Sequence, residues 1–523
     1  MGKLRITSRK RSKLAGAMGT TGGACRGTAL RAGFVSALLA LAAGAALAAP
    51  AAAQIPGLPP IPILNGPLAN SPSFKGGEAT PRPIEGVPEP PQHPFMAPNG
   101  RSNIHNDAHQ TDAYRVSGPL GDGAERSTLF VRECASIAFD SQGRIVTVCV
   151  GLDRPVLALL DPHSLATRAA LSLPPRNLLA GNNPFTDFSG GGYFYLDHRD
   201  RAVVATNDRR VLVVSIGSGP AFTVERSYSL ADAIGTDDGI ISVLPDWDGT
   251  LWFVSRKGVV GTIEPDGGAV RSLVLPGEGI SNSFAVDETG GVYLVSDAAL
   301  YRFDAGAGGA PAVTWRRPYP DSGLHKPGQS DAGSGTTPTV MGSKWVAITD
   351  NANPMNIRVY RRATGREICS EPIFAPGQSA TDQSLIAAGN AIIAENNHGY
   401  SITAVELGGT TSPGLVRVDV ERSKGKRKGY LCRTVWTSNE RAPSVVPKVS
   451  LANGLVYTYT KPAGTGISDP WYLTALDFRS GATIFKRLGG EGLGYNNNYA
   501  PVTLGPDGTA YVGVLGGLSA FSP

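Results

Sequence analysis

The first cluster of residues that could carry chemistry runs from Glu395 to Tyr400 and reads Glu-Asn-Asn-His-Gly-Tyr. A histidine close to a carboxylate suits acid–base catalysis, so His398 is a candidate base and Glu395 its candidate partner. A second Asn-rich segment, 350–356, occupies the equivalent place one repeat earlier. Amides of the two segments are candidate ligand contacts: Asn351, Asn353, Asn396 and Asn397. The alternative is that these side chains close Asx turns and have only a structural role.

Oxygen-bearing side chains also stand just before many of the apolar, β-rich runs. Glu133, Asp238, Asn282 and Asp382 offer carboxylate and amide oxygens, which are the ligands that Ca²⁺ prefers. Similar positions hold two candidate contacts to a polar ligand, Arg441 and Asn498. If the runs converge on an axis, these six side chains form one ring and predict a calcium or ligand site. The alternative is an ordinary solvated rim.

The sequence lacks a Gly-x-Ser-x-Gly elbow, a phosphate-binding loop, a dinucleotide fingerprint and an HExxH motif. Its net charge of +5 comes from eight basic residues in the first 53 positions, which contain no acidic residue. Without them, 40 basic residues face 43 acidic ones and the net charge is about −3, which argues against nucleic-acid binding. The basic cluster 424–428 is expected to be a solvated hairpin tip, with a polyanion site as the alternative.

The first 53 residues have the organisation of a secretory signal peptide: a basic start, an apolar run over 33–49 and an Ala-rich exit before Gln54. A membrane anchor is the alternative, although the run is short for spanning. We therefore predict an exported protein, secreted or held in the periplasm or cell envelope, with no transmembrane segment after cleavage. Residues 54–101 contain 13 prolines and are predicted to be a spacer that pairs with no strand. The folded domain is predicted over 102–523.

Cysteine positions predict two disulfides. Cys25 leaves with the leader, and an even number of cysteines in an exported protein favours disulfide pairing. If 140–143 is a hairpin turn, residues that face each other across it sum to 283, which pairs Cys134 with Cys149. Cys369 and Cys432 lie in corresponding late strands of neighbouring repeats and are predicted to form the second pair. Free thiols or a metal site are the alternatives, but CxxC spacing is lacking.

Short strands that recur along the body of the chain must position these residues. Tight turns rich in Asp and Gly, at 140–143, 246–249, 287–290 and 505–508, each precede a β-rich run. With less regular copies included, first strands begin near residues 134, 190, 240, 282, 336, 382, 444 and 500. This spacing predicts an all-β chain, a β-propeller of eight four-stranded blades, with seven as the alternative. A strand near 112–117 is predicted to complete the last blade and close the ring.

Residues 472–485, Tyr-Leu-Thr-Ala-Leu-Asp-Phe-Arg-Ser-Gly-Ala-Thr-Ile-Phe, resemble the repeat Ala-x-Asp-x-x-x-Gly-x-x-x-Trp of quinoprotein-type propellers. Segments 357–368 and 156–164 are similar but less regular. The resemblance implies the eight-bladed quinoprotein-like superfamily. Quinone dehydrogenases of that superfamily hold pyrroloquinoline quinone (PQQ) against a disulfide between adjacent cysteines, and their docking tryptophans recur from blade to blade. This chain has no adjacent cysteines and six tryptophans, so PQQ is not expected here.

Three functions are compatible with these observations, because a fold alone does not fix a function. The first is binding of a small molecule, a glycan or a cell-envelope protein through the axial face, favoured by the lack of a recognisable catalytic set. The second is a Ca²⁺-dependent hydrolase, since the ring of Glu, Asp and Asn resembles the metal site of lactonase propellers. The third is a quinoprotein-like oxidoreductase. The run from His105 to His109 is expected to fold over one propeller face, with metal binding as an alternative.

Overall fold

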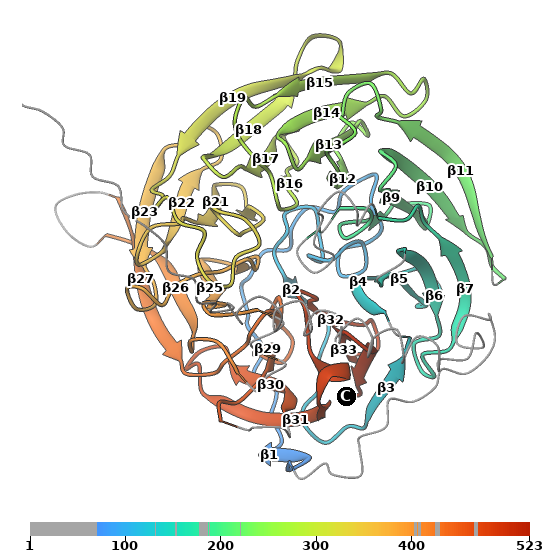
Figure 1. Cartoon of the computed structure of the whole chain (residues 1–523). Coiled ribbons are helices and arrows are strands. Elements are labelled where there is room, and N and C mark those ends of the chain that lie inside the picture. The colour runs from blue at the N-terminus through green and yellow to red at the C-terminus, as the bar shows by residue number, and fades with distance from the viewer. Residues whose placement is uncertain are drawn as a thin grey trace, which may run out of the picture. The chain divides into compact units, whose positions relative to one another are not determined.

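Eight four-stranded antiparallel blades, one of them extended by a strand at each edge to a six-stranded sheet, are arranged around a ring, and they confirm the predicted eight-bladed propeller (Figure 1). The computed structural model describes residues 71–130, 132–151, 154–176, 187, 189–219, 221–401, 405, 409–423, 429–464 and 469–523. The predicted leader, residues 54–70 of the predicted spacer and the basic cluster 424–428 lie outside the described residues. Within the described part, no helix is long and apolar enough to cross a membrane.

Each blade takes its strands in chain order, with the first strand innermost. Blades 1 to 4 are β4(Glu133–Phe139), β5(Ile145–Val150), β6(Val156–Leu160), β7(Thr167–Ser172); β8(Tyr195–Leu196), β9(Arg201–Ala205), β10(Arg210–Ile216), β11(Phe222–Ser229); β12(Ile240–Pro245), β13(Leu251–Ser255), β14(Val259–Ile263), β15(Val270–Val274); and β16(Ala285–Val286), β17(Val292–Val295), β18(Ala299–Ala305), β19(Pro311–Pro318). Blades 5 to 7 are β20(Thr339–Met341), β21(Trp345–Thr349), β22(Asn356–Arg361), β23(Glu367–Pro372); β24(Ile386–Ala388), β25(Ala391–Glu395), β26(Leu415–Arg422), β27(Tyr430–Ser438); and β28(Lys448–Ser450), β29(Leu455–Thr460), β30(Pro470–Asp477), β31(Thr483–Glu491). Blade 8 contains β32(Val502–Leu504), β33(Ala510–Val514) and β34(Gly517–Phe521), and short 3-10 helices lie at Ala307–Gly309 and Leu493–Tyr495.

Aspartates set the tight turns between first and second strands. Asp246 Oδ1 accepts hydrogen bonds from the amides of Asp248 and Thr250, each at 3.0 Å, and Oδ2 accepts the indole N–H of Trp252 at 2.8 Å. Asp287 repeats the arrangement one blade later, with the hydroxyl of Tyr293 in place of the indole. One carboxylate therefore closes the turn and also fixes a fully buried aromatic side chain, so the predicted turn chemistry is confirmed. Buried apolar and aromatic side chains of neighbouring blades pack against one another and form the core.

The ring is closed by an N-terminal strand, but not by the predicted one. β3(Glu125–Leu129) pairs antiparallel with β34 and supplies the outer strand of blade 8. The segment predicted for this role, 112–117, contains β2(Ala113–Tyr114), which pairs parallel with the innermost strand β28 of blade 7. The predicted segment therefore does not close the ring. The chain first passes the axis at 112–114, and the strand that follows, β3, reaches the rim and closes it.

Residues 96–114, here called the axial segment, run through the centre of the ring (blue in Figure 1). Its backbone carbonyls accept hydrogen bonds from amides of six innermost strands, at 2.7–3.1 Å: Phe139, Leu196, Val286, Val340, Ala387 and Val449. Two of these carbonyls, those of Ala108 and His109, belong to the run from His105 to His109, which therefore packs against the innermost strands. A single continuous segment thus ties together blades that are far apart in sequence.

The described part of the predicted spacer is also attached to the propeller. β1(Phe74–Gly76) pairs antiparallel with β31 at the outer edge of blade 7, and the amides of Arg82 and Ile84 donate to carbonyls of Asn453 and Leu451. The expectation that this stretch pairs with no strand is therefore wrong for β1. Between the paired points the segment is extended, as its prolines favour.

Both predicted disulfides are present. Cys134 and Cys149 face each other across β4 and β5, while Cys369 and Cys432 join the outer strands β23 and β27 of blades 5 and 6. The register behind the first pair differs from the one assumed. Near the turn, facing residues sum to 284, as for Phe139 with Ile145, and a β-bulge between Cys134 and Ser136 restores the sum of 283.

Candidate functional site

All twelve residues singled out in the sequence lie on one face of the ring. Neighbouring strands are antiparallel, so the residues before each first strand and after each second strand share a face, here called the loop face. The Asp-Gly turns define the opposite, turn face. The axial segment bonds residues at the middle or the end of the innermost strands, never the first, and so lies toward the turn face. Its inward side chains therefore form the floor below the loop-face residues.

Glu395 and His398 do not form a catalytic pair. Glu395 is fully buried between blades 6 and 7, where it accepts hydrogen bonds from Asn397 Nδ2 at 2.9 Å and Thr458 Oγ1 at 3.1 Å. Burial raises the pKa of Glu395 well above its ordinary value. His398 instead approaches Ser412 Oγ through Nδ1 at 3.2 Å, and partial burial together with Lys326 lowers the pKa of its imidazole.

The four asparagines of this region are engaged in loop structure. Asn396 Oδ1 accepts the amides of Ala380 and His398, and Asn397 Oδ1 accepts the amide of Asp382. Asn351 Nδ2 donates to Asp321 Oδ1 at 2.8 Å, and Asn353 Oδ1 accepts the amide of Gly377 at 2.6 Å. Of these contacts, only that between Asn396 and His398 has the spacing of an Asx turn, and the others join separate loops of the loop face.

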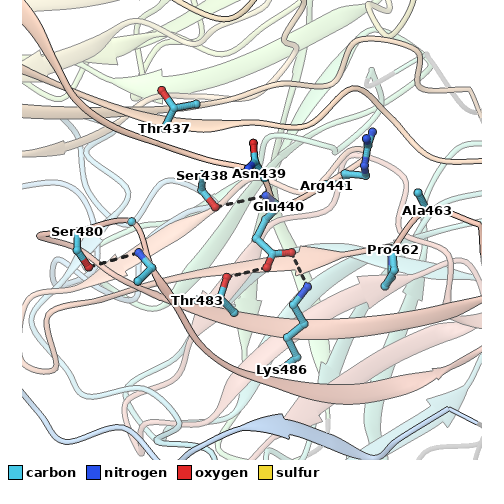
Figure 2. Close-up of a pocket in the computed structure, with 12 residues that line it drawn as sticks. Thr437, Ser438, Asn439, Glu440, Arg441, Pro462, Ala463, Ser480, Thr483 and Lys486 are labelled. Atoms are coloured by element: carbon cyan, nitrogen blue, oxygen red, sulfur yellow. Dashed lines mark hydrogen bonds and ion pairs between the residues drawn. The ribbon is translucent and has the colours of Figure 1, made fainter.

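Arg441 lines a polar groove formed by residues of blades 6 and 7 (Figure 2). The groove encloses about 580 Å³, and Arg441 Nη1 donates to the carbonyl of Thr411. Glu440 is already paired with Thr483 Oγ1, at 2.6 Å, and with Lys486. Glu440 and Lys486 thus neutralise each other, whereas Arg441 bonds a neutral carbonyl and keeps its positive charge at the groove.

The four predicted calcium ligands do not assemble as one site. Asp238 is part of a turn in blade 3, where its carboxylate accepts Ser255 Oγ at 2.6 Å and the amide of Lys257. Asn282 Oδ1 accepts the hydroxyl of Tyr193 at 3.3 Å. In the described ranges, no group of three or more His, Cys, Asp or Glu side chains is placed to hold a metal ion.

Two of these carboxyls, those of Glu133 and Asp382, have pKa values well above the ordinary range of acidic side chains. Glu133, 7% exposed, accepts the amide of Asn498 at 2.9 Å, and burial raises its pKa to about 8. Asp382 accepts the amide of Ser330, and burial raises its pKa to about 7. Each carboxyl therefore holds a proton to higher pH than an exposed acid does, and in its protonated form it can donate a hydrogen bond as well as accept one.

Ser384, His105, Asp112 and Lys448 were missed by the sequence analysis. His105 Nε2 lies 3.2 Å from Ser384 Oγ, and its Nδ1 lies 3.1 and 3.2 Å from the two carboxylate oxygens of Asp112. Lys448 Nζ donates to the same carboxylate and to the carbonyl of Ile104. All four side chains are buried. The only sequence signal was the His-rich run at 105–109, and nothing in the chain linked it to a serine 279 residues away.

We call the axial ring the set that surrounds this hydrogen-bonded chain on the loop face, namely Glu133, Tyr193, Asn282, Asp382, Gln383, Ser384 and Asn498. The ring of Tyr193 stacks on the imidazole of His105, with centroids 6.2 Å apart. Tyr193 and Asp382 are half-buried and reach solvent beside Ser384. Gln383 donates to the carbonyl of Ser444, whereas its buried Oε1 has no partner among the described residues.

The residues at the axis do not fit PQQ. Cys134 and Cys149 pack in the core between blades 1 and 8, and Cys369 and Cys432 join outer strands, so neither disulfide faces the axis. The axis itself is occupied by the axial segment. No chemical step is therefore derived through a quinone.

No protein-family model matches the chain. A protein of Archaeoglobus fulgidus, described only as an uncharacterized protein, is 28% identical over 312 residues, which are 54% of this chain and 60% of that protein. The chain thus spans less than two thirds of this relative. Among solved structures, a europium-containing methanol dehydrogenase is 12% identical with a TM-score of 0.50, covering 79% of this chain and 88% of that one. BamB from Moraxella catarrhalis is 12% identical with a TM-score of 0.40, covering 62% and 93%. The likeness to the methanol dehydrogenase supports the propeller fold.

Proposed function

We propose that the protein is an exported binding propeller whose axial ring holds a small, oxygen-rich polar molecule. The observation that carries the proposal is the pair of carboxyls in the axial ring, the buried Glu133 and the half-buried Asp382, whose pKa values are raised to about 8 and 7. Burying an acid costs free energy, and a fold retains such groups most readily where a ligand uses them. Perturbed groups in a polar environment are a common mark of a binding site.

The ring offers both hydrogen-bond donors and acceptors. Protonated Glu133 and Asp382 can donate, the Tyr193 hydroxyl, which donates to Asn282, can accept, and Gln383 Oε1 has no partner among the described residues. Such a set suits hydroxyl, carbonyl and ester oxygens of an uncharged molecule, whereas a cation would meet neutral carboxyls. The ligand class is therefore a sugar, a lactone or an ester.

Export is part of the same proposal. The leader-like first 53 residues motivate it, and two disulfides suit an oxidising compartment. In that setting the loop face is open to metabolites or glycans outside the cytosol.

Calorimetric titration of the mature protein tests the function with three probes: glucose, glucono-δ-lactone and ethyl butyrate. At least one probe is expected to bind saturably to the wild type and at least tenfold more weakly to Asp382→Asn. The matched control is Asp266→Asn, because Asp266 is an exposed carboxylate on the outer part of blade 3. Failure of all three probes, or equal binding to Asp382→Asn, contradicts the proposal.

A further inference from the structure

A hydrogen-bonded chain of nucleophile, base and carboxylate lies on the floor of the axial ring. Ser384 Oγ is 3.2 Å from His105 Nε2, and Asp112 holds the opposite ring nitrogen, Nδ1, at 3.1 Å. Each atom has the partner that nucleophilic catalysis requires: the hydroxyl meets one nitrogen and the carboxylate meets the other. The three residues come from two separate parts of the chain, since His105 and Asp112 belong to the axial segment and Ser384 lies two residues before β24.

We propose that Ser384, His105 and Asp112 form a catalytic triad and that the propeller cleaves carboxylic esters or lactones bound in its axial ring. The inference deepens the proposed function and rests on it, because the ring must first hold the ester. Ser384 and His105 are the catalytic residues, and Asp112 and Lys448 are positioning residues.

The surroundings of His105 suit a general base. The Asp112 carboxylate accepts the Nδ1 proton, which leaves Nε2 free to accept the proton of Ser384. Burial lowers the pKa of His105, so the ring is neutral near pH 7, as a base must be. Lys448, fully buried, donates to Asp112 and orients that carboxylate.

The chemistry balances without a cofactor. Ser384 Oγ attacks the carbonyl carbon while its proton passes to His105 Nε2. The carbon–oxygen bond to the alcohol then breaks, and His105 returns the proton to the departing oxygen. Water, with His105 as base, attacks the acyl-serine, and Ser384 regains its proton from His105 as the acid leaves. The sum is ester plus water to acid plus alcohol.

The competing account is structural: the same contacts fasten the axial segment to blades 6 and 7. A structural network makes no serine reactive toward an electrophile, whereas a triad does. Two features favour the catalytic account. Solvent reaches the half-buried Asp382, two residues from Ser384, and the half-buried Tyr193, which stacks on His105. The axial segment is already tied down by backbone hydrogen bonds to six blades, so anchoring does not require a serine–histidine contact.

The test treats the mature protein with a fluorophosphonate–rhodamine probe and maps the adduct by peptide mass spectrometry. We expect one adduct, on Ser384, with no labelling of Ser384→Ala and at least 100-fold slower labelling of His105→Gln. The matched control is Ser242→Ala, because Ser242 is an equally buried serine of an innermost strand, bonded to Ser283 at 2.8 Å and not to a histidine. This variant should label like the wild type. An unlabelled wild type, or an adduct elsewhere, overturns the triad.

Hydrolysis and binding are measured side by side so that the two proposals can fail separately. The wild type is expected to bind the non-hydrolysable butyl p-nitrophenyl ether and to release p-nitrophenol from p-nitrophenyl butyrate, and Ser384→Ala is expected to lose at least 100-fold of that rate. Binding without turnover in the wild type would reject the triad and keep the binding site. Neither binding nor turnover would reject both. If His105→Gln melts below the wild type, the comparison of Ser384→Ala with Ser242→Ala decides.

Discussion

Removing the buried cation at the axis should be among the most damaging single changes in the protein. Lys448 and Asp112 form an ion pair whose side chains are both 0% exposed. Lys448→Met takes away the positive charge and leaves Asp112 buried beside His105. Breaking a buried pair in this way costs about 3–5 kcal/mol, because the remaining charge keeps its desolvation penalty without its partner.

A second change makes the argument specific. In Asp112→Asn/Lys448→Met both charges are gone, and the amide that replaces the carboxylate can still bond the neutral imidazole of His105. The double variant should therefore be more stable than Lys448→Met alone, with a coupling energy of about 1–3 kcal/mol. Guanidinium unfolding followed by tryptophan fluorescence gives the free energies.

The control pair is exposed. Arg226 and Asp266 are 43% and 91% exposed, and Asp266→Asn should cost less than about 0.5 kcal/mol. A loss below about 1 kcal/mol for Lys448→Met, or a double variant whose loss equals the sum of the two single losses, would refute the view that a desolvated ion pair holds the axial segment.

Three further predictions concern pH, disulfides and metal. The Glu133 carboxyl keeps its proton to about pH 8 in the folded state and loses it near pH 4.5 in the unfolded state, so the free energy of unfolding should fall between those pH values by up to about 1.4 kcal/mol per pH unit. The free energy of unfolding of Glu133→Gln should fall less steeply with pH. An unchanged dependence on pH would contradict the assignment. Replacing Cys369 and Cys432 together by serine should cost about 4 kcal/mol and the other pair about 3, because the first closes a loop of 63 residues and the second one of 15; equal losses in chemical unfolding would argue against the loop-entropy explanation. EDTA should change the melting temperature by less than about 1 °C, because the predicted calcium ligands are hydrogen-bonded to separate parts of the structure. A drop of several degrees in calorimetry, reversed by Ca²⁺, would reinstate a metal site.

Local chemistry explains what the sequence could predict. Asp246 and Asp287 close tight turns through contacts to residues two and four positions later, so the turns and the hairpins around them are visible in a short window. The pair Cys134 and Cys149 was also found by counting residues across a hairpin turn. The count did not foresee the β-bulge between Cys134 and Ser136, but the sum of 283 that it used is correct for this pair.

Long-range placement explains what it could not predict. His105 meets Ser384 only because the chain crosses the axis before it enters the ring, and no periodicity reveals that path. The closing strand was misplaced for the same reason. Conversely, the cluster around His398 looked reactive in the sequence, yet its asparagines bond their own loops and its glutamate points into the contact with blade 7.

A structure of the mature protein with its strongest binder among glucose, glucono-δ-lactone and butyl p-nitrophenyl ether tests the central claim most directly. The account predicts the probe beside Asp382, Gln383 and Ser384 at the ring axis, with an oxygen within hydrogen-bond distance of the Asp382 carboxyl. A probe found instead in the groove lined by Glu440 and Arg441 would contradict it, and would move the functional site from the axis to the junction of blades 6 and 7.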